Sequence, residues 1–221
     1  MPQSKANRRR PTPARRRPPV IPITIAVLAL LGLVAVLVAS LGGDDDDTAA
    51  GTTIEEIRPV TVEGDPLVAL GSGEDPAVGA VAPQLDGAGF DGSPLRISAD
   101  GRPKVLVFLA HWCPHCQREV PVLAGWLADN GQPADVDLYG VATATTQDRP
   151  NYPPSAWLER EGFSVPVLAD DAAGTAAQAI GLSAYPFFIA LDGENRVVAR
   201  DTGELTVEQW EDLLARAAAP I

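Results

Sequence analysis

The sequence has few of the side chains that bind metals or haem. Its 221 residues include two cysteines, two histidines and one methionine, which is the first residue. A zinc site requires four converging ligands, but His111, Cys113, His115 and Cys116 lie within six positions, too short a stretch to surround a metal ion. Covalent haem requires the pattern C-x-x-C-H, and glutamine follows the second cysteine. A copper chaperone would use more distant His or Met ligands. We therefore expect neither a metal nor a cofactor.

Acidic residues are absent from the beginning of the chain, where basic residues are concentrated. One lysine and six arginines precede Val20, and the first acidic residue is Asp44. The remainder of the chain carries 10 basic against 29 acidic residues, so it repels the phosphate groups of nucleic acids. Nucleic acid is therefore excluded as a partner, and we interpret the basic segment as a signal for membrane topology.

No charged residue interrupts the 22 positions from Val20 to Leu41. At about 1.5 Å per residue, such a helix spans a bilayer core of about 30 Å. Because basic flanks remain in the cytoplasm, the pattern predicts a single-pass protein of a bacterial plasma membrane whose chain after Asp44 lies outside the cytoplasm. A cleaved signal peptide is the alternative, although the apolar stretch exceeds the usual ~7–15 residues. No cysteine follows this stretch until Cys113, which excludes a lipoprotein anchor.

Composition divides the chain into four parts. We expect a basic, disordered cytoplasmic tail over residues 1–19, because it is rich in arginine and proline. The transmembrane anchor covers residues 20–41. Residues 42–79 are expected to form an acidic stalk and an extended lead-in that packs loosely on the domain. Residues 80–221 are expected to hold the folded domain.

Apolar runs and turn residues outline the folded part. Strands are predicted over residues 57–62, 104–110, 136–142, 165–168, 185–191 and 196–200, and helices over 113–129, 153–160, 172–180 and 206–219. The run 104–110 is continuously apolar after its first lysine, which is typical of a central strand covered on both faces. Thr206 and Gln209 form a capping-box pattern. The order predicts an α/β fold in which helices flank a mixed sheet on both faces.

The two cysteines, Cys113 and Cys116, follow a predicted buried strand and open a helix. Backbone N–H groups are unpaired at a helix start, and their partial positive charge stabilises a thiolate. Thiolate is the attacking species in disulfide exchange. We therefore predict that Cys113 is the nucleophile and that Cys116, one turn further, resolves the mixed disulfide. In an oxidising compartment the pair would form a redox-active disulfide.

The two residues between the cysteines are expected to tune the reaction. Pro114 fits the first helical turn, and His115 can place an imidazole or imidazolium group beside the sulfur. Stabilising the thiolate favours the reduced form, which makes the disulfide a stronger oxidant. His115 therefore favours the oxidising end of a range that extends from about −270 mV for thioredoxin to about −120 mV for DsbA.

The segment Phe108–Cys116, with its sequence FLAHWCPHC, resembles the active site of the thioredoxin superfamily. The continuation Gln117–Pro121 is similar to the TlpA/ResA branch of anchored bacterial thioredoxin-like proteins, which shares a Glu and a Pro after the second cysteine. Val81–Leu85 and Phe90–Gly92 also fit that branch. The likeness covers residues 76–219 and implies a thioredoxin-like fold.

The resemblance implies roles for four further residues. Pro186 would be the cis-proline that faces the cysteines, and Tyr185 would line the substrate groove. Trp112 would lie partly in the core and partly at the rim of that groove. Glu119 is either an exposed helix charge or, as in the branch, a carboxylate that modulates the protonation of the cysteines. The buried Asp of cytoplasmic thioredoxins is replaced by Val107 here.

The sequence thus predicts a membrane-anchored thiol–disulfide oxidoreductase that acts on exported proteins. Its partners would be exported protein thiols or disulfides, the lipid bilayer and a membrane redox protein that recycles the cysteines. The TlpA/ResA-like scaffold and the DsbA-like Pro-His pair point in different directions, so oxidase and reductase both remain open. Two other classes of function are weaker. One is a tethered, non-enzymatic binding domain with an inert disulfide. The other is a peroxidase of thioredoxin fold, which is disfavoured because the Pro-x-x-x-Thr pattern that usually precedes a peroxidatic cysteine is absent before Cys113.

Overall fold

The apolar run at Lys104–Leu109 forms strand β4 in a computed structural model, which describes residues 53–219. All six residues of β4 are buried. Lys104 begins the strand, and its ammonium group donates hydrogen bonds to the carbonyls of Ser98 and Arg102 and to the carboxylate of Asp100. A buried charge is tolerated when it is paired and hydrogen-bonded in this way.

Strand β4 lies at the centre of a five-stranded sheet with the order β6-β5-β4-β7-β8. It pairs in parallel with β5, which pairs in parallel with β6, and it pairs antiparallel with β7, which pairs antiparallel with β8. The predicted mixed sheet is therefore confirmed. The elements that surround β4 are β1 (Thr61–Glu63), β2 (Gln84–Ala88), β3 (Pro94–Ile97), α2 (Pro114–Asn130), β5 (Asp137–Ala142), α3 (Pro154–Arg160), β6 (Val167–Ala169), α4 (Thr175–Ala179), β7 (Phe187–Leu191), β8 (Val197–Thr202) and α5 (Val207–Ala218).

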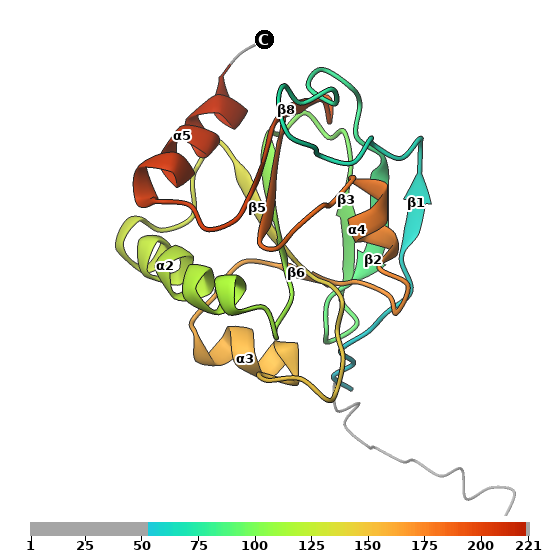
Figure 1. The fold of residues 1–221 in the computed structure, drawn as a ribbon, viewed down its shortest axis with the longest axis vertical. Coiled ribbons are helices and arrows are strands. Elements are labelled where there is room, and N and C mark those ends of the chain that lie inside the picture. The colour runs from blue at the N-terminus through green and yellow to red at the C-terminus, as the bar shows by residue number, and fades with distance from the viewer. Residues whose placement is uncertain (1–52, 220–221) are drawn as a thin grey trace, which may run out of the picture. The chain divides into compact units, whose positions relative to one another are not determined.

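Alternate residues of β4 enter two separate hydrophobic cores. Val105 and Val107 pack with side chains of α2, α3 and α5 on one face of the sheet. Leu106 and Phe108 pack with α4 and with strands β2 and β3 on the other face. Figure 1 shows this division, with α2, α3 and α5 on one side of the central strands and α4 with β1–β3 on the other. Helices cover both faces, as predicted.

A second sheet of three antiparallel strands, β1-β2-β3, is a feature that the sequence patterns do not predict. These strands are three to five residues long, and short segments rich in glycine and proline give no clear periodicity. The strand predicted over residues 57–62 begins only at Thr61. Pro59 precedes it and has no N–H to donate to a ladder.

The lead-in before β2 is held more firmly than the predicted loose packing. Leu67 is buried, and its backbone N–H donates to the carbonyl of Ala179. Arg200 of β8 donates to both carboxylate oxygens of Asp75, and its guanidinium also donates to the carbonyls of Val68 and Ile180. These contacts tie residues 53–79 to the domain.

Helices α2, α3 and α5 begin and end within one residue of their predicted bounds, whereas α4 is shorter than the predicted helix over 172–180. Helix α5 starts with the predicted capping box, in which the side chain of Thr206 accepts from the N–H of Gln209 and the Gln209 side chain accepts from the N–H of Thr206. Helix α2 starts one residue after Cys113.

The predicted tail, anchor and proximal stalk lie outside the described residues. Over residues 53–219, none of the helices has the length and apolar character needed to cross a membrane.

We predict that Asp75→Ala lowers the free energy of unfolding by about 3 kcal/mol, because it leaves the buried guanidinium of Arg200 without its counter-ion. The hydrogen bonds from Arg200 hold the pKa of Asp75 below its ordinary value. Urea unfolding of the domain would measure the change. The matched control is Asp65→Ala in the same segment, where the side chain is exposed and a change within about 0.5 kcal/mol is expected. Equal effects of the two substitutions would contradict the structural role of the ion pair.

Candidate active site

Cys113 lies at the junction between β4 and α2. Its N–H donates to the carbonyl of Ala110, and its own carbonyl accepts from the N–H of Gln117 in the first helical turn. Cys113 is the N-cap residue of α2, with the extended backbone angles φ −75° and ψ 122°. Its side chain makes no capping hydrogen bond, and Pro114 is the first residue of the helix. The N–H groups of the first turn therefore remain available to stabilise a negative charge on the sulfur.

The two sulfur atoms have different environments. Cys113 is 6% exposed, whereas Cys116 is fully buried, and both are free thiols in this structure. Burial raises the pKa of Cys116 well above its ordinary value, and negative charge on Cys113 or Glu119 would raise it further. Burial therefore favours the protonated form of Cys116. This asymmetry agrees with the order of attack that the sequence predicts.

The loop before β7 lies against Cys113. The Tyr185–Pro186 peptide bond is cis, as the resemblance implies. The Sγ atom of Cys113 lies 3.8 Å from the carbonyl oxygen of Tyr185, and Pro186 is buried. The rings of Trp112 and Tyr185 meet edge to face with their centroids 6.0 Å apart. The structure thus brings together the three residues predicted to form a substrate groove.

Trp112 is held on two further sides. Its indole N–H donates to the carbonyl of Ala144 at 2.9 Å, and the guanidinium carbon of Arg149 lies 5.6 Å from the ring centroid. A cation over an indole face is attracted by the π electrons. Arg149 was not anticipated from the sequence, because it lies 37 positions along the chain from Trp112, in a loop with no regular pattern.

His115 is exposed and belongs to a cluster of charged groups. Its Nδ1 lies 2.7 Å from the Oε1 atom of Glu204, and Arg118 donates to the same carboxylate at 2.6 Å. These hydrogen bonds, first from Arg118 and then from His115, lower the pKa of Glu204 to about 2. Glu204 is therefore ionised at physiological pH. No sequence signal pointed to Glu204, since it precedes α5 and lies 89 positions after His115.

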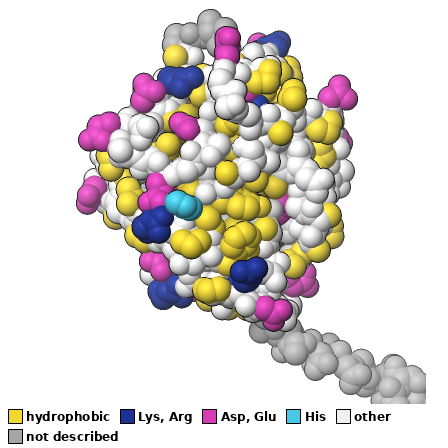
Figure 2. All heavy atoms as spheres, viewed as in Figure 1, with side chains coloured by type: hydrophobic (Ala, Val, Ile, Leu, Met, Phe, Trp, Pro, Cys, Tyr) yellow, Lys and Arg dark blue, Asp and Glu magenta, His cyan; other side chains and the backbone are white. Residues whose placement is uncertain are grey.

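Figure 2 shows one face of the molecule on which an exposed histidine has cationic and acidic side chains beside it. Hydrophobic side chains gather on its other flank. Such a patch beside polar groups is typical of a surface that binds another molecule.

Glu119 is buried rather than an exposed helix charge, because its residue exposure is 1%. Its Oε2 accepts a hydrogen bond from the N–H of Leu205 at 3.1 Å, whereas Oε1 has no partner within residues 53–219. Burial raises the pKa of Glu119 to about 7. Of the two interpretations that the sequence allowed, burial contradicts the exposed helix charge, and the action of this carboxyl group on the cysteines stays a prediction.

His111 is a buried residue whose role the sequence did not indicate. The structure places Nδ1 2.6 Å from the carbonyl oxygen of Pro150, to which Nδ1–H donates, and Nε2 accepts from the N–H of Thr146. The Tyr152–Pro153 bond in the same loop is also cis. His111 thus connects the end of β4 to the loop that precedes α3.

Known proteins resemble this chain in sequence and in fold. The family model described as Redoxin matches residues 76–214. The thiol:disulfide interchange protein HelX of Rhodobacter capsulatus is 29% identical over 158 residues, which cover 69% of this chain and 77% of HelX. The soluble secreted antigen MPT53 of Mycobacterium tuberculosis is 45% identical over 62 residues, covering 28% of this chain and 32% of the antigen.

Solved structures support the fold. A putative thiol:disulfide interchange protein DsbE from Chlorobium tepidum has a TM-score of 0.53 at 21% identity, over 64% of this chain and 98% of that one. StoA from Bacillus subtilis has a TM-score of 0.50 at 20% identity, over 63% of this chain and 99% of that one. At these identities the likeness concerns the arrangement of helices and strands, and it confirms the predicted thioredoxin-like fold.

We predict that Glu119→Gln changes the pH dependence of stability. The folded-state pKa of about 7 exceeds the ordinary value of 4.5, so the wild-type domain loses stability as pH rises through this window, while the amide does not titrate. The difference in free energy of unfolding between the two proteins should change by about 2 to 3 kcal/mol between pH 5 and pH 8. Denaturant unfolding at several pH values measures it. Glu159→Gln, at an exposed position, serves as the control. If the free energies of unfolding of the wild type and Glu119→Gln differ by the same amount at every pH, the raised pKa is refuted.

Proposed function

Because the chain belongs to the Redoxin family and is a thiol–disulfide oxidoreductase, we propose that it is anchored in a bacterial plasma membrane and exchanges disulfides with exported proteins through Cys113 and Cys116. The observation that carries the proposal is the difference between the two sulfurs. Cys113 lies at the start of α2 beside the carbonyl of Tyr185, whereas Cys116 is fully buried. The uncharged segment 20–41 and the basic residues before it support the anchor and its orientation.

In the reducing direction, the thiolate of Cys113 attacks one sulfur of a substrate disulfide. A bond forms between Cys113 and the substrate, and the other substrate sulfur leaves as a thiolate. Cys116 then loses its proton and attacks the sulfur of Cys113, which releases the second substrate thiolate and leaves a Cys113–Cys116 disulfide. Two electrons have passed from the dithiol to the substrate. The reverse sequence oxidises a substrate dithiol.

The proton of Cys116 requires an acceptor, because burial disfavours its thiolate. We assign this role to Glu119, which lies one helical turn further along α2. Its pKa of about 7 suits a general base near neutral pH. The unpartnered Oε1 of Glu119 can accept the proton without losing a hydrogen bond within the described residues.

We propose that the substrate polypeptide binds in a groove formed by Trp112, Tyr185 and Pro186. Their positions around Cys113 support this role. The proline has no N–H, so the carbonyl of Tyr185 is the backbone group available for pairing with an extended peptide at this point. The cysteine pair is the redox centre of this proposal, so no bound cofactor is included. A membrane redox protein is proposed to recycle the pair.

A trapping experiment tests the proposal. Cys116→Ser in the full-length protein removes the resolving thiol, so substrates should accumulate as mixed disulfides with Cys113 that are sensitive to reductant. The adducts should appear in the membrane fraction and contain exported proteins. Cys113→Ser in the same cells is the control and should give no adducts and no turnover. Normal turnover by the Cys113→Ser protein would reject the catalytic assignment, and adducts with cytoplasmic proteins would reject the proposed orientation.

We also predict that His115→Pro lowers the reduction potential of the cysteine pair by about 30 to 60 mV. The substitution removes an imidazole ring in the first turn of α2, two positions after Cys113, together with its contact to Glu204. If the imidazole stabilises the thiolate of Cys113, its loss makes the disulfide less oxidising. Equilibration with a thioredoxin of known potential measures the shift. The control is Val122→Ala at an exposed position of α2, which should leave the reduction potential unchanged. If His115→Pro also leaves the potential unchanged, the role of His115 is disproved.

A further inference from the structure

Arg149 lies over the ring of the residue that precedes the reacting cysteine. Its guanidinium carbon is 5.6 Å from the ring centroid of Trp112. Arg149 is exposed, and within residues 53–219 it forms neither an ion pair nor a hydrogen bond. The ring contributes π electrons but no oxygen atom, so the N–H donors of the guanidinium remain available to a carboxylate.

This free charge distinguishes Arg149 from the other cations of the domain. Acidic residues outnumber basic ones in residues 53–219, and each of the other basic side chains there has a polar partner. All but one of them form ion pairs with carboxylates, and the exception, Arg216, donates to the carbonyl of Val198. Asp148 precedes Arg149 and is also exposed, but the two form no ion pair. The positive charge of Arg149 is therefore not compensated by a direct contact with an acidic group.

The loop that carries Arg149 is held by the segment that carries the cysteines. The Nδ1–H group of His111 donates to the carbonyl of Pro150, one residue after Arg149. The Nε2 atom of the same ring accepts from the N–H of Thr146, three residues before Arg149. His111 lies two positions before Cys113. The backbone at Arg149 is thus ordered before a substrate binds, which lowers the entropy cost of binding.

On the α2 side of Cys113, positive charge is already neutralised. The Nδ1 atom of His115 and the guanidinium of Arg118 both contact the carboxylate of Glu204, at 2.7 Å and 2.6 Å. A substrate carboxylate on this side would have to compete with Glu204 for the same donors.

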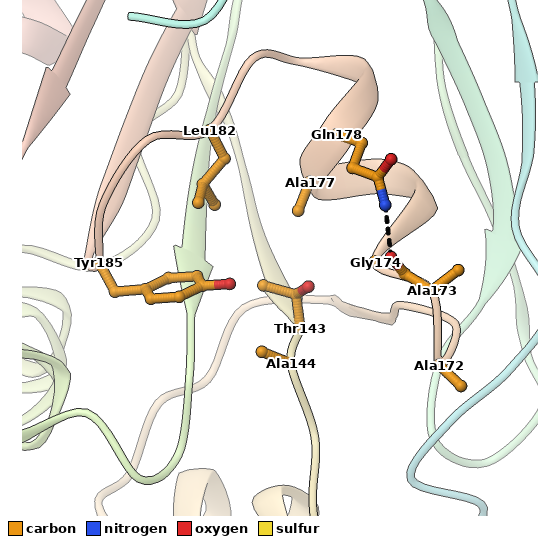
Figure 3. A pocket seen from close by; sticks show the side chains of 9 residues that line it. All are labelled: Thr143, Ala144, Ala172, Ala173, Gly174, Ala177, Gln178, Leu182 and Tyr185. Atoms are coloured by element: carbon orange, nitrogen blue, oxygen red, sulfur yellow. Dashed lines mark hydrogen bonds between the residues drawn. The ribbon is translucent and has the colours of Figure 1, made fainter. Parts of the chain in front are cut away.

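The surroundings of Tyr185 offer no counter-charge either. A pocket of about 250 Å³ lies beside this ring, and all the residues that line it are uncharged. Figure 3 shows these side chains, with the ring of Tyr185 reaching toward Thr143. Of the three sides of the site that the structure describes, the Trp112 side is the one that presents an unpaired cation.

We propose that Arg149 is a specificity determinant that binds an acidic side chain of the substrate polypeptide, within three positions of the cysteine that reacts with Cys113. The proposal rests on the proposed function, because it requires a polypeptide thiol or disulfide at Cys113. Three residues of extended chain span about 10 Å, enough to reach a group that lies on the ring of the residue next to Cys113. The guanidinium would donate two parallel hydrogen bonds to the carboxylate, the geometry that arginine favours.

The test uses short peptides whose single cysteine forms a disulfide with 2-mercaptopyridine. The thiolate of Cys113 in the reduced full-length protein attacks the peptide sulfur, which joins the peptide to Cys113. Pyridine-2-thiolate leaves, takes up a proton and reports the rate by its absorbance, and this uncharged product does not compete for Arg149. Glutamate or glutamine is placed in turn at the three positions on each side of the cysteine.

On one side of the cysteine, glutamate should give a rate constant about threefold higher than glutamine at low ionic strength, the size expected of one exposed ion pair. The ratio should approach one in about 1 M salt, which screens exposed charges. Because the domain is acidic overall, a general effect of charge would instead slow the glutamate peptides at every position.

Three variants test the assignment of this preference to Arg149. Arg149→Gln should remove it, Arg149→Lys should retain part of it, and Arg149→Glu should favour lysine over glutamine at the same position. The matched control is Arg216→Gln, which removes a cation from an exposed position of α5 and should leave the preference intact. Each ratio compares two peptides on one protein, so a purely structural role of Arg149 would change both rates and leave the ratio unaltered.

Equal rates for glutamate and glutamine at all six positions would overturn the role of Arg149 while leaving thiol exchange at Cys113 in place. A glutamate preference that persists in Arg149→Gln would also overturn it. If none of the peptides reacts faster with the wild-type protein than with Cys113→Ser, the proposed function itself fails.

Discussion

The active site depends on the burial of β4 and on the way that this strand ends. All six strand residues are buried, and five of them pack into the two cores. The position of Ala110 is therefore fixed, and its carbonyl accepts the N–H of Cys113. That contact sets the first sulfur at the start of α2 and the second one turn inside the protein. The different reactivities of the two cysteines follow from this placement more than from the residues between them.

The groups around the site come from two segments that are distant in the sequence, the start of α2 and the residues before α5. Glu204 and Leu205, which precede α5, meet His115 and Glu119 of α2. The Glu204–His115 pair is exposed to solvent. It therefore orients the imidazole ring but adds little to the stability of the fold. The buried Glu119 is different, because the low polarity around it moves its pKa to about 7. Proton transfer is thus assigned to the buried Glu119, and redox tuning to the exposed His115, which contacts Glu204.

Sequence reasoning reached the parts of this structure that depend on local patterns. The continuous apolar run predicted β4, and Thr206 and Gln209 predicted the start of α5. The pattern after β4 predicted a helix from Cys113, one residue before α2 begins. It missed the sheet β1-β2-β3, whose strands are too short to show periodicity. It also missed Glu204 and Arg149, since their contacts join segments 37 to 89 positions apart. Such contacts depend on how the chain is folded, and the neighbouring residues of a single sequence carry no record of them.

The central claim is that Cys113 and Cys116 form a working redox pair in the full-length protein. An equilibrium titration with reduced and oxidised glutathione, followed by mass spectrometry after acid quenching, tests it most directly. The account predicts one reversible two-electron transition between dithiol and disulfide, with the same midpoint from either starting state. If the cysteines instead remain in their starting form at every glutathione ratio, the pair is inert and the account is wrong.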